Sequence, residues 1–496
     1  MPSVELSKRV IIIGSGVAGL SSAIRLRAAG FEVEVFEAND YPGGKLSQFE
    51  LSGYRFDAGP SLFTMPHFLE ELFADSGADL RDYFSYMRKE VVCKYYFEDG
   101  TRFTAFADKE HYADEASNVF RVTKEEVNRY FAQSAMKYEV TESLFLKKSL
   151  HKLSTYLSKE TIRGVMKAHR LGLMNTLHAE NKKTFKDERM VQLMNRYATY
   201  NGSSPYRTPG IMSMIPHLEQ HYGTFFPKGG MISITNAMFQ RAQEMGVVFH
   251  FNKRVDEVVV YEGRAMGVRI GDATIQSDIV LSNMDVMPTY RRLLPREKAP
   301  ERTLRQERSS SALIFYWGIN REFPELDLHN IFFASDYKKE FDVLFEGKEV
   351  ADDVTVYVHI SSKDEKSDAP PGCENWFVMV NVPGNKGQDW DALIPQIRER
   401  VVSKLSRLLG CDISSRIEAE HILDPRGIES RTSSYQGSLY GAASNNRFAA
   451  FLRHPNFSSR IQNLYFCGGS VHPGGGIPLC LMSGKIATDI IRQDHC

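Results

Sequence analysis

The feature that most constrains the fold is a glycine-rich turn between two short apolar runs near the N-terminus. Residues 10–13, VIII, are a β-branched run typical of a buried parallel strand. GSGVAG follows at 14–19, a helical pattern continues to Gly30, and FEVEVF at 31–36 leads into Glu37. This order of strand, glycine turn, helix, strand and acid predicts a βαβ unit that binds a dinucleotide.

Each residue type in this unit has a chemical reason to be there. Gly14 permits the tight turn, Gly16 lets the backbone approach a pyrophosphate, and Gly19 lets the helix pack close to the strand. The free N–H groups at the helix N-terminus attract phosphate. Glu37 is placed to accept hydrogen bonds from an adenosine ribose, which suits NAD or FAD and disfavours NADP. A purely structural glycine turn is the alternative.

A second glycine pair separates FAD from NAD. YPGGKLS at 41–47 resembles the GGRxxS signature that follows the first βαβ unit in a large group of flavoproteins. Lys45 stands where arginine is usual, and a lysine is a point charge without the bidentate fork, so phosphate geometry is less constrained. The alternative is an ordinary Gly-Gly turn beside a solvated lysine.

Four further stretches carry a family resemblance over nearly the whole chain. They are YRFDAGPSLFTMP (54–66), RYATYNGSSPYRTPGIMSMIPHLE (196–219), FPKGGMISITNAM (226–238) and NLYFCGGSVHPGGGIPLCLMSGKIATDII (463–491). In this order they resemble the bacterial-type phytoene desaturase family of FAD-dependent carotenoid desaturases, within the amine oxidase-like flavoproteins. GGKLS and the first stretch look most like the hydroxycarotenoid 3,4-desaturase branch. LCLM at 479–482 and Lys485 depart from the family pattern near the expected flavin.

The resemblance implies an α/β fold with a discontinuous Rossmann-like FAD-binding domain of the amine oxidase/phytoene desaturase type. A substrate domain with a mixed sheet and helices completes it. We expect residues 1–77, 222–291 and 457–496 in the FAD-binding domain, 78–140 and 292–456 in the substrate-binding domain, and 141–221 in a helical, membrane-docking region. Strands are expected at 312–319, 353–362 and 375–383, a covering helix at 391–409, and an exposed loop at 363–374.

The predicted cofactor contacts come from both ends of the chain and from one position in the middle. Gly468 and Gly469 permit close backbone approach, and a helix from about Ile477 can face the flavin ring with its N-terminus. Val255 resembles the family position that contacts adenine, although it reads equally well as a plain strand valine. The full set is Gly14, Ser15, Gly16, Val17, Ala18, Gly19, Glu37, Ala38, Gly43, Gly44, Lys45, Leu46, Gly59, Pro60, Ser61, Val255, Gly468, Gly469, Gly476, Ile477 and Pro478.

Residues 144–183 predict a membrane-facing surface. Four leucines fall at helical spacing, and basic residues far outnumber acidic ones; the residues are Leu146, Leu150, Leu153, Leu157, Lys147, Lys148, Lys152, Lys159, Arg163, Lys167, Arg170, Lys182 and Lys183. A solvated helix face is the alternative. A carotenoid strongly prefers a bilayer to water, since each buried CH₂ gains about 0.8 kcal/mol, so the enzyme must draw its substrate from a membrane.

Bulk properties narrow the setting. The formal net charge of −1 argues against a nucleic-acid partner. Six scattered cysteines without a CxxC pair indicate reduced thiols, and no apolar run approaches the ~20 residues of a spanning helix. We therefore expect a cytoplasmic protein attached peripherally to the inner face of the cytoplasmic membrane, with no metal.

The resemblance implies desaturation of a membrane-borne acyclic or monocyclic carotenoid, with 3,4-desaturation of a 1-hydroxycarotenoid as the specific expectation. One hydrogen passes as hydride to N5 of FAD and the other leaves as a proton. Oxygen and a quinone both remain open as the final electron acceptor. His472, Asp57 and Glu219 are candidate bases, but none is chosen and the catalytic residues stay unknown.

Several alternatives remain open on the same scaffold. They are a phytoene or diapophytoene desaturase, a carotene isomerase, another amine oxidase-like flavoenzyme, and a non-enzymatic prenyl-lipid carrier of the Rab-escort type. The intact glycine set and Glu37 argue against the carrier.

Overall fold

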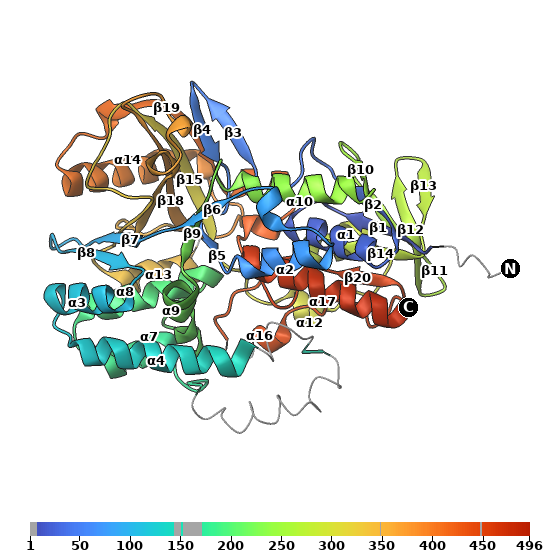
Figure 1. Ribbon diagram of the computed structural model, residues 1–496, viewed down its shortest axis with the longest axis horizontal. Coiled ribbons are helices and arrows are strands. Elements are labelled where there is room, and N and C mark those ends of the chain that lie inside the picture. The colour runs from blue at the N-terminus through green and yellow to red at the C-terminus, as the bar shows by residue number, and fades with distance from the viewer. Residues whose placement is uncertain (1–6, 143–149, 152–170, 348, 447–448) are drawn as a thin grey trace.

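A parallel sheet forms one end of the molecule. The computed structural model describes residues 7–142, 150–151, 171–347, 349–446 and 449–496 (Figure 1). The sheet has the order β10-β2-β1-β14-β20, and its strands are β1 (Arg9–Ile13), β2 (Glu32–Phe36), β10 (Val248–His250), β14 (Ile279–Ser282) and β20 (Leu464–Phe466). Every pairing is parallel. Three segments far apart in the sequence therefore share one sheet, which confirms the predicted discontinuous Rossmann-like architecture.

The helices that pack with this sheet bring the two chain ends together. They are α1 (Val17–Ala28), α2 (His67–Asp75), α10 (Ile232–Glu244) and α17 (Ile477–His495). Helices α1 and α17 lie side by side, and Ser21 Oγ donates to the Leu481 carbonyl at 3.4 Å. Lys8 Nζ donates to the carbonyl of His495 at 2.6 Å. The N-terminal βαβ unit and the C-terminal helix thus form one packed unit.

Three smaller sheets are separate from the parallel sheet. One antiparallel sheet contains β11 (Glu257–Tyr261), β12 (Arg264–Ile270) and β13 (Ala273–Gln276). A hairpin contains β3 (Gln48–Leu51) and β4 (Tyr54–Asp57), and a three-stranded sheet contains β5 (Phe63–Thr64), β9 (Thr224–Pro227) and β6 (Tyr86–Arg88).

A seven-stranded mixed sheet forms the second large layer. Its order is β19-β15-β18-β17-β16-β7-β8, with β7 (Val91–Tyr96), β8 (Arg102–Phe106), β15 (Ser311–Ile319), β16 (His329–Phe332), β17 (Val356–Ile360), β18 (Glu374–Val382) and β19 (Ile417–Leu423). Only the β16–β7 pairing is parallel. The strands expected at 312–319, 353–362 and 375–383 are all present.

Strand β15, which lies between β19 and β18, is buried along its full length because both faces of the sheet are covered. Leu313 and Trp317 pack with α14 (Trp390–Leu409), while Ile314 and Tyr316 pack with the β3–β4 hairpin and α15 (Pro425–Thr432). This alternation follows from the two-residue period of a strand. One face therefore rests on the predicted covering helix, and the other turns toward the parallel sheet.

A helical layer lies beneath the seven-stranded sheet (Figure 1). Its helices are α3 (Lys109–Val119), α4 (Lys124–Thr141), α7 (Leu177–Thr184), α8 (Glu188–Asn195), α13 (Tyr337–Glu346) and the short α9 (Ile215–His217). The short helices α11 (Val286–Pro288), α12 (Glu301–Leu304) and α16 (Ala449–Leu452) lie elsewhere. Thr123 and Glu126 form a capping box that begins α4. Within the described residues, no helix combines the length and apolar character needed to cross a bilayer.

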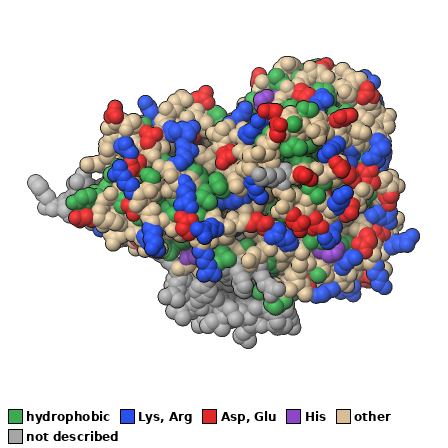
Figure 2. Space-filling view, turned by 180° about the vertical axis from the view of Figure 1, so that it is seen from behind, with side chains coloured by type: hydrophobic (Ala, Val, Ile, Leu, Met, Phe, Trp, Pro, Cys, Tyr) green, Lys and Arg blue, Asp and Glu red, His purple; other side chains and the backbone are tan. Residues whose placement is uncertain are grey.

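Most of the predicted membrane-facing surface lies outside the described residues. Of its leucines only Leu150 is described, and it is buried. Lys182 and Lys183 are exposed and pair with Glu188 at 3.0 Å and Glu180 at 2.7 Å. Figure 2 shows Lys and Arg side chains mixed with Asp and Glu side chains over the face that it presents.

The expected exposed loop at 363–374 is wrong in its centre. Asp368 is only 1% exposed, and its carboxylate accepts from Arg55 Nε at 2.5 Å and Nη2 at 2.7 Å. Arg55 lies on β4, far from this loop in sequence, and is itself largely buried. A buried guanidinium requires a carboxylate partner, and Asp368 supplies it.

Candidate functional site

A single large cavity of about 500 Å³ joins the parallel sheet to the seven-stranded sheet. It begins at the glycine turn after β1 and reaches residues of β15, β16, β17 and β18. All the predicted cofactor-binding residues except Ser15 and Gly19 line it. The sequence therefore located the walls of one cavity from segments at both ends of the chain, although their contact with FAD stays a prediction.

Ser15 and Gly19 support the cavity from behind. The Ser15 amide and Oγ donate to Glu37 Oε2 at 2.8 and 2.9 Å. A Cβ on Gly19 would lie 2.2 Å from the carbonyl oxygen of Gly14, so only glycine allows α1 to approach β1 this closely. This close packing is the role that the motif predicts for its third glycine.

Glu37 directly follows β2, and its carboxylate is fully hydrogen-bonded. Besides the two bonds from Ser15, its Oε1 accepts from the amide and Nδ2 of Asn39 at 2.9 and 3.0 Å. A carboxylate has about four acceptor sites, so these bonds fill them. Because Asn39 also lines the cavity, a ribose hydroxyl can bind Glu37 by replacing the Asn39 side-chain amide. This competing donor was not predictable from the sequence.

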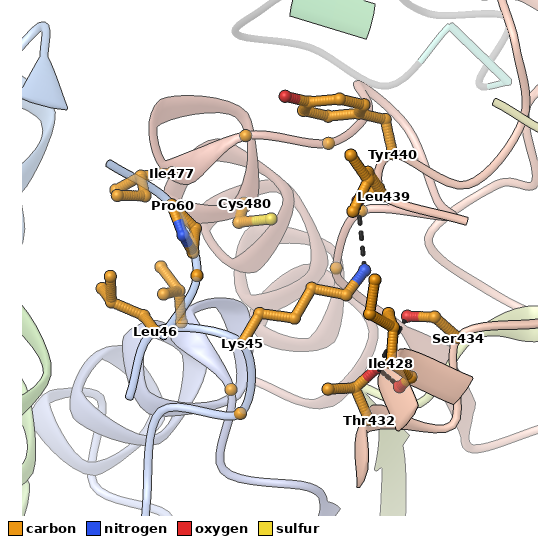
Figure 3. Close-up of a pocket in the computed structure, with 18 of the residues that line it drawn as sticks. Lys45, Leu46, Pro60, Ile428, Thr432, Ser434, Leu439, Tyr440, Ile477 and Cys480 are labelled. Carbon is orange, nitrogen blue, oxygen red and sulfur yellow. Dashed lines mark hydrogen bonds between the residues drawn. The ribbon is translucent and has the colours of Figure 1, made fainter. Parts of the chain in front are cut away.

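Lys45 crosses the cavity wall from the second glycine pair toward the 438–439 backbone (Figure 3). Its Nζ donates to the carbonyls of Ser438 and Leu439, each at 3.1 Å. Burial lowers the pKa of Lys45 from 10.5 to about 8, since a desolvated ammonium is costly, and the nearby Asp285 carboxylate opposes the shift. Figure 3 shows its aliphatic stem passing beside Leu46 and Cys480. An anionic ligand in the cavity would favour the charged form.

The opposite wall is the N-terminus of α17. Gly476 has φ +103° and begins the helix, and an added Cβ there meets no atom within 4 Å. Ile477 and Pro478 form the first turn and also line the cavity. An open glycine surface and the positive end of a 19-residue helix suit an anionic, planar group.

The residues that line the cavity fit FAD. Glycine backbones, the ribose-type carboxylate and a partly buried cation lie along the same cavity as a second helix N-terminus. This donor set suits the adenosine, diphosphate and ring portions of an extended dinucleotide. Gly14, Gly16, Glu37, Lys45 and Gly476 are the residues that would hold it.

Several cavity residues were missed by sequence reasoning. Asn283 and Asp285 follow β14, and the carboxyl end of β14 lies beside that of β1. Ligands bind at the carboxyl ends of the strands in open parallel sheets, so the position of these two residues could have predicted them as part of the site. Arg431 and Tyr440 also line the cavity, but no motif marks the segment that contains them.

The candidate bases occupy different settings. Asp57 accepts from the amides of Met231 and Ile232 at 3.0 and 3.1 Å and from Arg55 Nη1 at 3.1 Å, so it holds the start of α10. Neither Asp57 nor His472 lines the cavity. Buried His472 accepts at its carbonyl from Ser483 Oγ at 2.9 Å.

Glu219 does line the cavity, but its carboxylate is already engaged. Arg196 Nη2 lies 3.1 Å from both of its oxygens, Tyr197 donates to Oε2 at 2.6 Å, and Tyr200 donates to Oε1. Burial would disfavour the Arg196 cation, yet the Glu219 charge outweighs this and raises the pKa of Arg196 well above its usual value. This cluster is an ion pair at the cavity wall rather than a free base.

The sheet contributes an apolar wall to the far part of the cavity. Ile314, Phe377 and Met379 come from β15 and β18, Ile331 from β16, and Phe341 from α13. Side chains of this kind bind hydrocarbon without directional contacts.

The fold and site define a dinucleotide-binding oxidoreductase with an attached apolar cavity. The model of the family described as flavin containing amine oxidoreductase matches residues 17–492, and the chain belongs to that family. It is accordingly an FAD-dependent oxidoreductase, as the sequence predicted.

Individual relatives and solved structures agree with this assignment. The chain is 55% identical to a 1-hydroxycarotenoid 3,4-desaturase of Flavobacterium sp. (strain P99-3), over 98% of this chain and 100% of the relative. It is 34% identical to a 4,4'-diapolycopene oxygenase of Methylomonas sp, over 98% and 99%. The solved cyclohexylamine oxidase of Brevibacterium oxydans IH-35A has a TM-score of 0.63 at 15% identity, over 99% of each chain, and shares the fold.

Proposed function

We propose that this protein is an FAD-dependent carotenoid desaturase that forms the 3,4 double bond of a 1-hydroxycarotenoid. The observation that carries the proposal is the single cavity that runs from the dinucleotide cradle to the apolar face of the seven-stranded sheet. Full-length 55% identity to a 1-hydroxycarotenoid 3,4-desaturase supports the specific substrate and bond.

The chemistry needs few polar groups from the protein. Desaturation removes a hydride and a proton from adjacent carbons, and bound FAD supplies the hydride acceptor. The chain's own residues exclude water and align the polyene: Ile314, Phe377 and Met379 provide the apolar wall. An extended polyene stabilises positive charge at an allylic carbon, so a strong base is not required.

We also propose the domain division and the membrane attachment given by the sequence. The FAD-binding domain comprises 1–77, 222–291 and 457–496, and 78–140 with 292–456 form the substrate-binding domain. The basic region within 141–221 docks the protein on the inner face of the cytoplasmic membrane, where the carotenoid dissolves. Reoxidation of the flavin by oxygen or by a membrane quinone can be separated by assaying turnover with each acceptor alone.

The other activities on this scaffold make different demands. An amine oxidase binds a polar amine, whereas the full-length 55% identity of this chain to a 1-hydroxycarotenoid 3,4-desaturase favours a carotenoid substrate. An isomerase leaves the number of double bonds unchanged. A prenyl-lipid carrier has no use for the glycine cradle, Glu37 and Lys45 that line this cavity.

Expression in bacteria that make different carotenoid precursors tests the proposal. Pigment analysis should show a longer chromophore from 1-hydroxycarotenoids and little change in unhydroxylated ones. Efficient conversion of phytoene would replace the specific proposal with a phytoene desaturase, and a product of unchanged hydrogen content would replace it with an isomerase.

A further inference from the structure

Three polar side chains from separate elements form a hydrogen-bonded chain on the cavity wall. Tyr357 Oη lies 2.8 Å from Ser61 Oγ and 2.7 Å from His329 Nδ1. Ser61 follows the Gly59–Pro60 turn, Tyr357 lies on β17, and His329 lies on β16. All three line the cavity. This hydrogen-bonded series therefore starts at Ser61, itself one of the predicted cofactor contacts, and is anchored in the seven-stranded sheet.

The hydrogen bonds among Ser61, Tyr357 and His329 leave the Ser61 hydroxyl able to form a further hydrogen bond. Burial lowers the pKa of His329 well below its usual value, so its ring is neutral and Nδ1 either accepts from Tyr357 or donates to it. In the first case Ser61 donates to Tyr357 and keeps its lone pairs; in the second Tyr357 donates to Ser61, whose own hydrogen stays available. Among the described residues, Tyr357 is the one hydrogen-bond partner of Ser61 Oγ.

The chemistry of the proposed substrate requires a polar group at this kind of position. The oxygen on C-1 is three bonds from C-3, which places them about 3–4 Å apart by standard bond lengths. The reacting carbon must approach the hydride acceptor to about 3–3.5 Å. The hydroxyl must therefore bind within a side chain's length of the flavin ring, beside the residues predicted to contact it.

Two other polar side chains on the wall, Glu219 and Lys45, are already engaged. The Glu219 carboxylate is engaged by Arg196 and by two tyrosines. Lys45 Nζ donates to two backbone carbonyls. Ser61 adjoins the Gly59–Pro60 cofactor turn and combines open hydrogen-bonding capacity with a fixed position, because Tyr357 and His329 hold it.

We propose that Ser61 binds the C-1 hydroxyl of the substrate and distinguishes hydroxylated from unhydroxylated carotenoids, with Tyr357 and His329 as positioning residues. This inference rests on the proposed function. A serine that both accepts and donates matches an alcohol, which also does both. When an unhydroxylated carotenoid binds, the Ser61 hydroxyl has no hydrogen-bond partner on the substrate. Sites built to hydrogen-bond a substrate hydroxyl discriminate strongly against the analogue that lacks it.

The test compares kcat/KM for a 1-hydroxycarotenoid and for the same carotenoid without the hydroxyl, both in liposomes. In Ser61→Ala the ratio of the two constants should fall about tenfold, the loss expected for one hydrogen bond. Tyr357→Phe should lower the ratio by a smaller factor because it releases Ser61 without removing it. Ser61→Thr keeps the hydroxyl and should preserve the ratio.

A matched control makes the same chemical change elsewhere in the sheet. Tyr96 lies on β7, donates to the Glu325 carbonyl at 2.9 Å and does not line the cavity, so Tyr96→Phe should leave the ratio unchanged. Bound FAD per chain and the thermal unfolding midpoint of each variant identify any general loss of structure. A structural role for Ser61 would lower both constants together.

The outcomes separate this inference from the proposed function. An unchanged ratio in Ser61→Ala, or equal losses on both substrates, overturns the role of Ser61 while desaturation by the wild type stands. A wild-type protein that converts neither carotenoid overturns the proposed function, and the inference with it.

Discussion

Ser15 and Glu37, at the carboxyl ends of two neighbouring strands, are joined by two hydrogen bonds to one carboxylate oxygen. The hydrogen bond from the Ser15 amide joins the glycine turn to the residue that follows β2, and the hydrogen bond from Ser15 Oγ orients the Glu37 carboxylate. Asn39 completes the set on the other oxygen. The glycine motif and its acid are therefore one hydrogen-bonded unit rather than two separate contacts.

Removing the Glu37 charge should weaken FAD binding. Hydrogen bonds to a charged group contribute about 1.5–3 kcal/mol, so Glu37→Gln should raise the Kd for FAD by roughly 10–150-fold. Titration of the apo-protein by flavin fluorescence measures this. Glu34→Gln is the matched control, because Glu34 lies on β2, just before Glu37, and pairs with Arg9 and His250 outside the cavity. Equal effects of the two variants would contradict a ribose contact by Glu37.

FAD affinity should fall as the pH rises above about 8. The free protein holds the pKa of Lys45 at about 8 through burial, and anionic FAD binds the charged form. Below that pH the ammonium is already present; above it, binding must take up one proton, and the Kd rises by up to about tenfold per pH unit. Lys45→Arg stays charged and should give a flat profile over pH 7–10. A flat profile in the wild type would remove Lys45 from the anion site.

Asp57 should matter for stability more than for chemistry. Its carboxylate accepts two amides at the start of α10 and pairs with Arg55. Asp57→Asn should lower the free energy of unfolding by about 1–3 kcal/mol, the loss typical of charge-assisted hydrogen bonds. Measured kcat at saturating FAD should stay well within the roughly 100-fold loss expected for removal of a general base. A larger loss in a stably folded variant would make Asp57 the base.

The Arg196–Glu219 pair should behave as a buried ion pair. The side chains are 8% and 3% exposed, so Glu219→Gln leaves an uncompensated cation and should cost about 3–5 kcal/mol. Adding Arg196→Met removes that cation, while the glutamine still accepts from Tyr197. Denaturant unfolding should show most of the lost stability restored in the double variant. A double variant less stable than the single one would show that the arginine stabilises by packing instead.

The N-terminal half of the site was predictable because its geometry is local. Strand, glycine turn, helix and acid follow one another within 30 residues, and their order alone sets the roles of Gly19 and Glu37. The C-terminal residues that line the cavity were predictable only through the family resemblance, because no local pattern in residues 464–478 indicates which strand they pair with. Their position beside β14 emerged from the sheet pairing.

Contacts between distant segments were not predictable from one sequence. The sequence around Asp368 is typical of a polar loop. The structure shows instead that the Asp368 carboxylate pairs with the largely buried Arg55 guanidinium. Ser61 and Tyr357 are separated by 296 positions, and only the packing of β17 against the 59–61 turn brings their hydroxyls together. Such pairings depend on the register of whole elements, which no local pattern encodes.

The most direct test mixes the FAD-loaded protein with a 1-hydroxycarotenoid in liposomes without oxygen or quinone. The absorbance of oxidised flavin and that of the carotenoid are recorded together. We expect oxidised flavin to disappear in a one-to-one ratio with the appearance of a chromophore longer by one double bond. Flavin that stays oxidised while the carotenoid changes, or a carotenoid that stays unchanged beside fully loaded FAD, would contradict flavin-dependent desaturation.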